Sequence, residues 1–284
     1  MLRIKREFVV ESVRDMIIES TKTLDKSIVD KLFSAYENER NPLAKSVLDK
    51  IIINQEIAKK DNIPLCQDTG LVVCFVEIGR DLSFDYDLTE AINEGVHRGY
   101  VEGYLRKSVV SHPLDRINTK DNTPAVIHYD FIPGNAMKIH LAPKGGGSEN
   151  MSALKMLSPS EGRDGIINFV LETIKNAGGK PCPPIIVGVG IGGNFEHVAY
   201  LAKKAIFRHI DDESAIETDR LLEEELLEKV NQLDVGPMGL GGKTTALAVK
   251  VESAPCHIAS LPVAINLQCH SARKKEVILI GKEN

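Results

Sequence analysis

The spacing of apolar residues divides the chain into a helical N-terminal part and a longer part in which strands and helices alternate. In the first part, apolar residues recur every three or four positions, which is typical of amphipathic helices. This pattern predicts helices at Lys5–Glu19, Lys26–Glu37 and Pro42–Lys59. We expect them to form one helical layer, about residues 1–62, packed over one side of the polar loop that follows.

Strand and helix signals then follow one another. The continuous apolar run 71–79 predicts a buried strand, and helical spacing from about Thr89 to Val110 predicts a helix that carries Arg106 near its C-terminal end. Alternating apolar and polar residues in Pro124–Phe131 and Ala136–Leu141 flank a Pro-Gly-Asn turn. This arrangement is typical of a β-hairpin.

The second half of the chain continues this alternation. Ser158-Pro-Ser-Glu161 combines an N-cap serine, a proline at the first helical position and a glutamate three residues after the cap, which predicts a helix that ends near Ala177 at Gly178. Further elements are expected at 185–189 (strand), 196–207 (helix), 211–230 (helix with a solvated acidic face), 245–251, 263–267 and 276–280 (strands). No repeat or linker interrupts the chain, so we expect one mixed α and β (α+β) domain over residues 1–284.

Composition limits the class of protein. Hydrophobic residues make up 43% and charged residues 26% of the 284 residues, which is ordinary for a globular protein. No apolar run approaches the roughly 20 residues of a membrane span, and the N-terminus lacks a signal-peptide core, so we expect no membrane association and a cytoplasmic location. A net charge of -5 with mixed signs makes nucleic acid an unexpected partner but leaves room for a local cationic pocket for a small anion.

A polar loop immediately precedes the first predicted strand. The segment Leu65-Cys-Gln-Asp-Thr-Gly70 places a thiol, an amide, a carboxylate and a hydroxyl side by side. Loops beside rigid strands often carry binding and catalytic groups, because the strand fixes the backbone. The alternative is an ordinary polar turn that ends at a glycine.

The cysteines indicate free thiols. Their number, five, is odd, they are far apart in sequence, and there is no secretory signal, so a disulfide framework is not expected. Cys74 lies inside the predicted strand and is interpreted as a small buried hydrophobic residue. Cys66, Cys182 and Cys269 lie in loops among proline, polar or small residues, and Cys256 is intermediate.

The three loop thiols raise the question of a metal site. Cys66, Cys182 and Cys269 are 116 and 87 residues apart, so they can meet only through the fold. This spacing excludes zinc fingers and ribbons, which need closely spaced pairs. Three thiolates in one cleft would suit an iron–sulfur cluster in which one iron keeps open coordination positions and acts as a Lewis acid. Three unrelated thiols are the alternative.

Three glycine-rich segments are candidate anion sites. Lys144-Gly-Gly-Gly-Ser-Glu149 could point backbone N–H groups at an anion, or it could be a flexible loop without a ligand. Gly188–Gly193 fits G-x-G-x-x-G between a strand and a helix, so a nucleotide-binding protein is an alternative of another class, although no first βα unit opens the chain. Gly239–Thr244 imitates a P-loop, but Pro237 stands where the Walker pattern has glycine.

Taken together, several motifs resemble one known family. The chain resembles the alpha subunit of the class I, iron–sulfur fumarate hydratases and L(+)-tartrate dehydratases, in order from about residue 10 to the C-terminus. The motifs that carry the resemblance are Cys66–Gly70, the Arg106 segment, Lys144–Glu149, Cys182-Pro183-Pro184, Gly190–Gly193 and Gln268–Arg273.

The resemblance implies a set of site residues. It implies a [4Fe-4S] cluster held by Cys66, Cys182 and Cys269. It also implies substrate contacts from Gln67, Asp68, Arg106, Gly146 and His257, with Asp68 as the catalytic base and His257 as a further catalytic group. The alternatives are a helix-terminal cation for Arg106 and a core histidine for His257. Lys144 and Lys243 are further candidate electrostatic helpers.

The resemblance also implies an activity and a partner. The expected reaction is the reversible hydration of fumarate to (S)-malate, a step of the tricarboxylic acid cycle, and the rival is dehydration of L(+)-tartrate to oxaloacetate. Single-chain members of the family continue into a second domain, so we expect a separate beta subunit, in an α2β2 assembly, and poor turnover by this chain alone. A non-catalytic interaction subunit is the remaining alternative.

Overall fold

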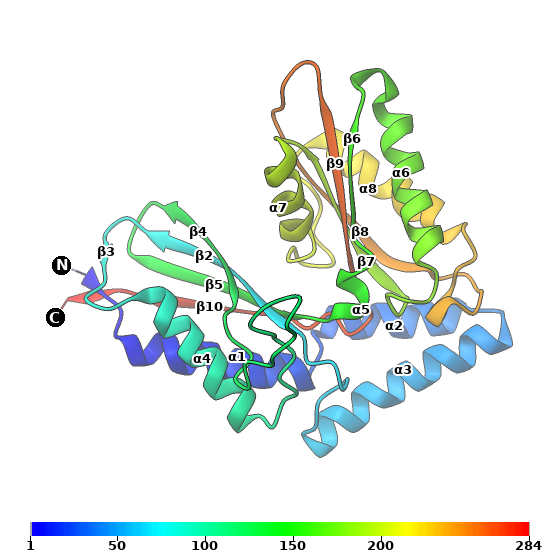
Figure 1. Cartoon of the computed structure of the whole chain (residues 1–284). Coiled ribbons are helices and arrows are strands. Elements are labelled where there is room, and N and C mark those ends of the chain that lie inside the picture. Colours follow the sequence, from blue (N-terminus) through cyan, green and yellow to red (C-terminus); the bar gives the residue numbers. More distant parts are fainter. Residues whose placement is uncertain (1, 284) are drawn as a thin grey trace. The chain divides into compact units, whose positions relative to one another are not determined.

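The structure, a computed structural model, describes residues 2–283 and combines helices with three small sheets (Figure 1). The predicted mixed α and β fold is confirmed. Within the described residues, unit 1 comprises 2–24, 57–146 and 273–283, and unit 2 comprises 25–56 and 147–272. The prediction of one catalytic domain over the whole chain stays a prediction.

Unit 1 is a four-stranded sheet of order β10-β5-β2-β4 with two helices packed along one face (Figure 1). Its main elements are α1 (Arg6–Lys22), β2 (Leu71–Gly79), α4 (Leu88–Glu102), β4 (Val126–Ile132), β5 (Ala136–Lys144) and β10 (Lys275–Ile280). A second small sheet contains β1 (Leu2–Arg3), β3 (Leu82–Ser83) and β11 (Lys282–Glu283).

Glycines bring the two helices of unit 1 close together. A Cβ atom at Gly95 of α4 would lie 2.6 Å from the side chain of Val13 in α1, and one at Gly99 would lie 3.1 Å from Ile17. The close contact lets both helices bury apolar side chains against the alternate residues of β2 that face them, Val72, Cys74 and Val76.

The predicted hairpin between β4 and β5 is wrong. The two strands do not pair with each other, because β2 lies between them, parallel to β4 and antiparallel to β5. The connecting turn crosses the end of β2 so closely that a Cβ atom at Gly79 would lie 2.2 Å from the carbonyl oxygen of Gly134. The alternating pattern specified both strands, but it could not specify their partners.

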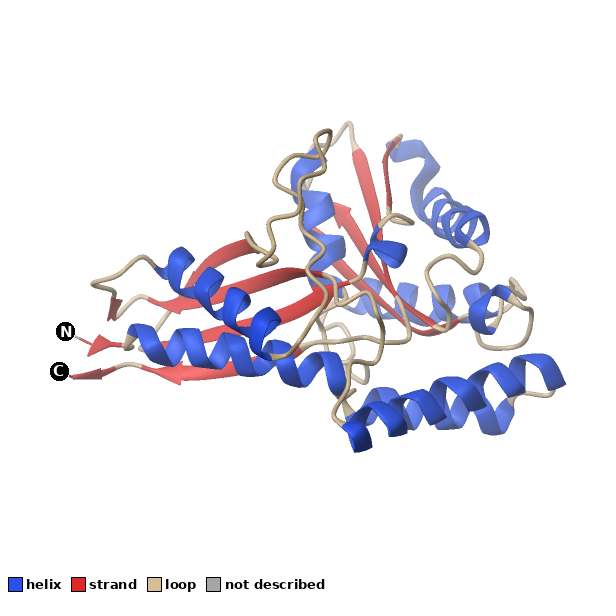
Figure 2. Cartoon of the chain, turned by 60° about the horizontal axis from the view of Figure 1, so that its bottom comes forward, coloured by secondary structure: helices blue, strands red, loops and turns tan. Residues whose placement is uncertain are grey.

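The helix that was predicted to reach Val110 ends at Glu102 instead. Gly103 caps it by donating its N–H to the carbonyl of Gly99 at 3.0 Å, and Tyr104 adopts a positive φ of 53° that a helix cannot continue. Arg106 therefore lies in the long loop that follows α4, not on the helix. Figure 2 draws the loops and turns of the chain in tan.

Unit 2 is a three-layer arrangement around a sheet of order β6-β9-β7-β8. Helices α6 and α8 pack on one face of the sheet, and α7 packs on the other. The elements are α2 (Lys26–Asn38), α3 (Pro42–Asp61), α5 (Gly146–Glu149), β6 (Ala153–Leu157), α6 (Gly162–Ala177), β7 (Ile185–Gly192), α7 (Phe195–Ala205), α8 (Glu217–Asn231), β8 (Ala246–Ala254) and β9 (Leu261–Gln268).

The three helices predicted in the N-terminal part of the chain are all present, as α1, α2 and α3. They do not form one layer within one unit, because α1 belongs to unit 1 whereas α2 and most of α3 belong to unit 2.

The predicted capping box is also present, with Ser158 and Glu161 satisfying each other's backbone N–H groups before α6, and Gly178 ends that helix.

The G-x-G-x-x-G segment has a packing explanation. Gly188 and Gly190 lie inside β7 rather than in a loop between strand and helix. Cβ atoms there would lie 2.3 Å from the carbonyl oxygen of Ala202 and 2.2 Å from that of Val198, both in α7. These glycines let the helix lie directly on the strand, so they fulfil the motif without forming a phosphate loop.

The helix predicted at 211–230 begins later, at Glu217, and its acidic face is not wholly solvated. The segment before it is held in a turn by Arg208, whose guanidinium contacts the carboxylate of Asp212 at 3.0 Å. Arg208 also contacts the buried Glu223 at 2.6 Å, and Asp219 is buried as well. Tertiary ion pairs therefore override the helical spacing here.

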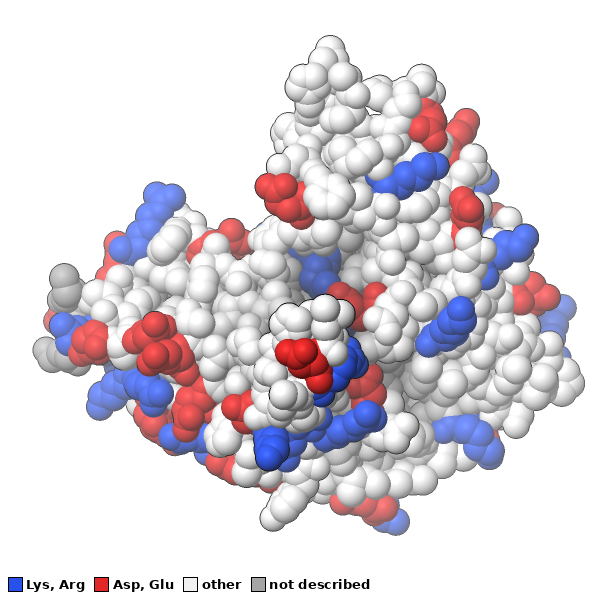
Figure 3. All heavy atoms as spheres, in the orientation of Figure 1, with Lys and Arg blue, Asp and Glu red and all other residues white. Residues whose placement is uncertain are grey.

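The surface agrees with the composition. On the face drawn in Figure 3, basic and acidic side chains are interspersed. Among residues 2–283, no helix is both long enough and apolar enough to cross a membrane.

Candidate active site

The loop Cys66–Gly70 leads into β2 and is fixed from the side of α4. Tyr100, a fully buried residue of α4, donates its hydroxyl to the backbone carbonyls of Thr69 at 2.5 Å and Gly70 at 3.0 Å. Burial raises the pKa of the Tyr100 hydroxyl, which keeps it a donor. The backbone of the loop is thus held in place, while the side chains of Cys66 and Gln67 are exposed.

A second set of contacts ties this loop to the long loop after α4. The buried Asn122 donates its amide to the carbonyl of Gly70 at 3.1 Å and accepts the N–H of Ser108 at 2.6 Å. The hydroxyl of Thr69 donates to the carbonyl of Arg106 at 2.7 Å. Arg106 therefore lies beside the site loop, although it is not on a helix.

The carboxylate of Asp68 is oriented by backbone donors. Its Oδ1 accepts the N–H of Gly70 at 3.0 Å, and its Oδ2 accepts the N–H of Gly146 at 2.8 Å. The guanidinium of Arg273, which is 3% exposed, donates to the backbone carbonyl of Asp68. Two N–H donors and a fixed backbone leave this carboxylate one orientation, as a general base requires.

Arg273 and the first glycine of the loop complete this arrangement. A Cβ atom at Gly145 would lie 3.2 Å from both Nη2 of Arg273 and Oδ2 of Asp68, so only glycine fits without displacing them. Arg273 belongs to the motif Gln268–Arg273, but no role was predicted for it. Tyr100 and Asn122 were not predicted, because no local sequence signal marks a residue that acts through a backbone carbonyl distant in sequence.

The Tyr100 contacts give a first prediction. Tyr100→Phe removes the hydroxyl that donates two hydrogen bonds, and the carbonyl of Thr69 loses this buried donor. We therefore expect the free energy of unfolding to fall by about 1–3 kcal/mol. Urea unfolding measures the effect. The matched control is Tyr104→Phe, since the Tyr104 side chain is 92% exposed and should change stability by less than about 0.5 kcal/mol. Equal stability of the two variants would contradict the anchoring role.

Arg106 presents an available cation. Arg106 is exposed, and its guanidinium forms no ion pair with any residue of the described range 2–283. The lack of an internal carboxylate partner fits the predicted role as a carboxylate clamp, because an internal ion pair would compete with the substrate.

Glu149 anchors the glycine loop at its other end, within unit 2. Both carboxylate oxygens of Glu149, the last residue of α5, accept from Nζ of Lys203 at 2.5 Å, and one accepts the amide of Asn266 at 3.0 Å. Burial lowers the pKa of Lys203, and the charge of Glu149 partly offsets this effect. The turn that starts at Gly146 is therefore fixed by a charged contact.

Two of the three predicted cluster ligands lie together in unit 2. Cys182, which has a positive φ of 56°, precedes β7, and Cys269 follows β9. His270 donates its N–H to the carbonyl of Cys182 at 3.3 Å, and its Nδ1 lies 2.9 Å from the same oxygen. A residue with a positive φ beside the thiol of Cys269 is common in functional loops. Cys66 belongs to unit 1, so the three-thiol set stays a prediction.

No metal-binding group of three or more His, Cys, Asp or Glu side chains is present within the part of the chain that the structure describes. Among residues 2–283, none of the five cysteines forms a disulfide bond. The chemistry of the donor set nevertheless fits an iron–sulfur cluster, since Cys66, Cys182 and Cys269 are loop thiols that are exposed or partly exposed and form no disulfide.

The remaining cysteines differ from these three. Cys74 is buried in β2, which confirms its interpretation as a small buried hydrophobic residue, and burial raises its pKa to about 12. Cys256 is exposed in the turn between β8 and β9, where its Sγ contacts the carbonyl of Ser260 at 3.3 Å.

His257 lies in the same turn, far from the two thiols of unit 2. In the sheet register, Ile186 pairs with Gln268 and Ile191 with Val263, so His257 and Cys269 flank opposite ends of β9. A strand of eight residues separates the ends by roughly 25 Å. The exposed ring of His257 accepts the N–H of Ala259 at 3.1 Å, so it is not a core histidine.

The two lysines considered as helpers also differ. Lys144, at the end of β5, is 3% exposed, whereas Lys243 lies exposed in the P-loop-like segment. In that segment the N–H of Gly242 donates to Asp234 at 2.8 Å, and the N–H of Lys243 donates to Glu39 at 2.7 Å. Internal carboxylates occupy the donors that a bound phosphate would need.

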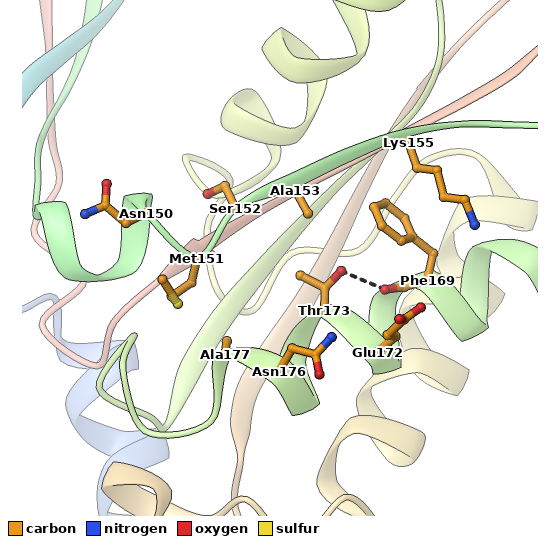
Figure 4. Close-up of a pocket in the computed structure, with 10 residues that line it drawn as sticks. All are labelled: Asn150, Met151, Ser152, Ala153, Lys155, Phe169, Glu172, Thr173, Asn176 and Ala177. Atoms are coloured by element: carbon orange, nitrogen blue, oxygen red, sulfur yellow. Dashed lines mark hydrogen bonds between the residues drawn. The ribbon is translucent and has the colours of Figure 1, made fainter. Parts of the chain in front are cut away.

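A separate pocket of about 470 Å³ lies between β6 and α6 of unit 2 (Figure 4). Its wall includes Lys155 and the ring of Phe169, and Thr173 donates its hydroxyl to the carbonyl of Phe169 at 2.8 Å. None of the predicted site residues lines this pocket.

Comparison with known proteins supports the motif-based resemblance. The family model described as "Fumarate hydratase (Fumerase)" matches residues 10–278. The chain is 47% identical over 269 residues to a Methanocaldococcus jannaschii protein named "Putative L(+)-tartrate dehydratase subunit alpha", covering 92% of this chain and 94% of that protein. It is 33% identical over 264 residues to the L(+)-tartrate dehydratase subunit alpha of Escherichia coli K12, covering 92% and 86%, respectively.

The match covers both units and the loops that carry Asp68 and the three thiols. The predicted family is therefore confirmed, and the chain belongs to the fumarate hydratase (fumerase) family of hydro-lyases.

Proposed function

We propose that this chain is the alpha subunit of an iron–sulfur hydro-lyase that interconverts fumarate and (S)-malate. The observation that carries the proposal is the Asp68 carboxylate, held by the N–H groups of Gly70 and Gly146 beside the exposed thiol of Cys66. A fixed carboxylate next to a free loop thiol suits a hydro-lyase that removes a proton from carbon.

In the dehydration direction, Asp68 accepts the proton from the carbon next to the carboxylate of malate. The electron pair of that C–H bond forms the double bond, and the C–O bond of the neighbouring carbon breaks as hydroxide leaves. The hydroxide and the proton held by Asp68 together account for the one water released. The geometry that Gly70 and Gly146 impose on Asp68 removes the need to orient the base at each turnover.

Arg106 and Gln67 are the proposed substrate contacts beside this base. The exposed guanidinium of Arg106 binds a substrate carboxylate through paired hydrogen bonds, which stabilises the negative charge that develops as the proton leaves. Gln67, next to Asp68 in the loop, offers an amide that can donate and accept. Gly146 acts through Asp68, since its N–H already donates to that carboxylate.

The proposed cofactor is a [4Fe-4S] cluster held by Cys66, Cys182 and Cys269. When bound, it supplies an open, Lewis-acidic iron for the hydroxyl group that leaves. The resemblance also assigns His257 to the substrate, and its position at the far end of β9 from Cys269 gives that assignment no support within unit 2.

The proposed assembly includes a separate beta subunit. Two observations support it: the relatives are named as alpha subunits, and the chain covers 94% of the Methanocaldococcus jannaschii protein, so that relative carries no large extra domain. We expect the purified chain alone to turn over poorly.

Dehydration of L(+)-tartrate is the second candidate, and the names of the relatives favour it. The substrates differ by one hydroxyl, so a few polar contacts decide between them. The test compares initial rates of the assembled, anaerobically reconstituted enzyme on (S)-malate and L(+)-tartrate. We expect kcat/KM for malate to be at least tenfold higher, and the reverse order would assign the enzyme to tartrate.

A further inference from the structure

The long loop after α4 contains an ordered projection. Residues 107–120, here called the finger, fold back on themselves through a bridge between Val110 and Asn118. The N–H of Ser111 donates to the carbonyl of Ile117 at 2.7 Å, and the N–H of Thr119 donates to that of Val109 at 3.0 Å. The finger is therefore held by its own backbone hydrogen bonds, like a short hairpin.

The tip of the finger exposes large apolar side chains. Every residue from 111 to 118 is exposed, and Leu114 and Ile117 are 83% and 66% exposed. Within residues 2–283, nothing covers the side chains of Leu114 and Ile117, although backbone hydrogen bonds already hold the finger that carries them. Such a tip loses little conformational entropy when it binds, which favours a recognition element.

The charges around these side chains point to the kind of surface that would cover them. The finger carries the cations Lys107, Arg116 and Lys120 and one acidic residue, Asp115, whereas the whole chain has a net charge of -5. A complementary surface is therefore an apolar pocket with an acidic rim.

The base of the finger is joined to the catalytic loop. Just before the finger, the carbonyl of Arg106 accepts the hydroxyl of Thr69. Within it, the N–H of Ser108 donates to Asn122, which in turn donates to Gly70. A displacement of the finger would therefore act on the two residues that follow the proposed base, Thr69 and Gly70, and on the backbone of the proposed carboxylate clamp.

We propose that the finger is the docking element for the beta subunit, and that its binding maintains Arg106 in the position beside the Asp68 loop that the contact with Thr69 gives it. This inference rests on the two-subunit assembly proposed above. It places Leu114 and Ile117 in an apolar pocket of the partner with an acidic rim.

The test uses the full chain co-expressed with the beta-type subunit of the same source. The variant is Leu114→Asp with Ile117→Asp, which puts two charges where apolar burial is expected, and we expect the dissociation constant for the beta subunit to rise at least 100-fold. The matched control is Phe131→Asp in β4 of the same unit, where the side chain is 68% exposed, and it should bind as the unmodified chain does. Urea unfolding of each chain alone checks that the variants fold.

A second variant separates docking from a general loss of structure. Arg116→Glu should weaken binding at least tenfold at low salt and less at high salt, since the lost attraction is electrostatic. At a saturating concentration of the beta subunit, the kcat of this variant should return to that of the unmodified assembly, because Asp68 and the thiols are intact.

The outcomes are distinguishable. Unchanged binding of the double variant to the beta subunit would overturn the docking role and leave the proposed function standing. Failure of the unmodified chain to assemble with any beta subunit would overturn the two-subunit proposal and the docking role together. Loss of self-association, measured by sedimentation of the chain alone, with intact beta-subunit binding would assign the finger to a second copy of the chain and overturn the proposal.

Discussion

An Asp68→Asn variant is expected to lose roughly 10²–10⁴-fold in kcat for malate dehydration, the usual contribution of a general base. The amide has nearly the same shape as the carboxylate but cannot take up the proton from carbon. Steady-state rates of fumarate formation by the assembled enzyme measure the loss. A second readout is exchange of the malate C–H proton with deuterated solvent, which should fall with kcat, because both depend on the same proton transfer.

A control is needed, because Asp68 also accepts two backbone N–H groups, and an amide can offer an oxygen to only one of Gly70 and Gly146. Urea unfolding and iron content of the variant separate this structural cost from the catalytic loss. Asp81→Asn, in an exposed turn of the same unit, is the matched substitution and should leave kcat unchanged. A kcat within about threefold of the unmodified enzyme would remove Asp68 from the role of base.

The sequence predicted what depends on neighbours along the chain. The helical spacing of α1, α2 and α3, the apolar run of β2 and the Ser158 capping box are local patterns, and each is present in the structure. The loop motif around Asp68 was identified in the same way, since its chemistry is visible in adjacent letters.

Contacts between distant residues could not be read from the sequence. The position of β2 between β4 and β5 depends on strand pairing, and nothing in an alternating pattern identifies the partner strand. The fixed geometry of Asp68 depends on Arg273, Tyr100 and Asn122, which reach its loop from three other segments of the chain. Arg106 was misplaced because one glycine ends α4 inside a region of otherwise helical spacing.

Single substitution of Cys66, Cys182 or Cys269 by alanine is expected to abolish assembly of the cluster and to lower kcat by at least 10³-fold. Anaerobic reconstitution of the unmodified chain should give about four irons and four acid-labile sulfides per chain with broad visible absorption, as a [4Fe-4S] cluster requires. Removing one of three thiolates leaves too few protein ligands to hold the cluster, so iron, sulfide and absorption should fall together.

The chain offers its own control for this prediction. Cys256 is also an exposed free thiol of unit 2, but it lies at the opposite end of β9 from Cys269. If the cluster needs the particular loops at 66, 182 and 269 rather than any accessible thiol, Cys256→Ser should retain full iron and activity. Loss of iron in Cys256→Ser, or retention of iron in Cys66→Ala, would contradict the ligand set. The second result would confine the iron to unit 2, where His270, the residue after Cys269, contacts the carbonyl of Cys182.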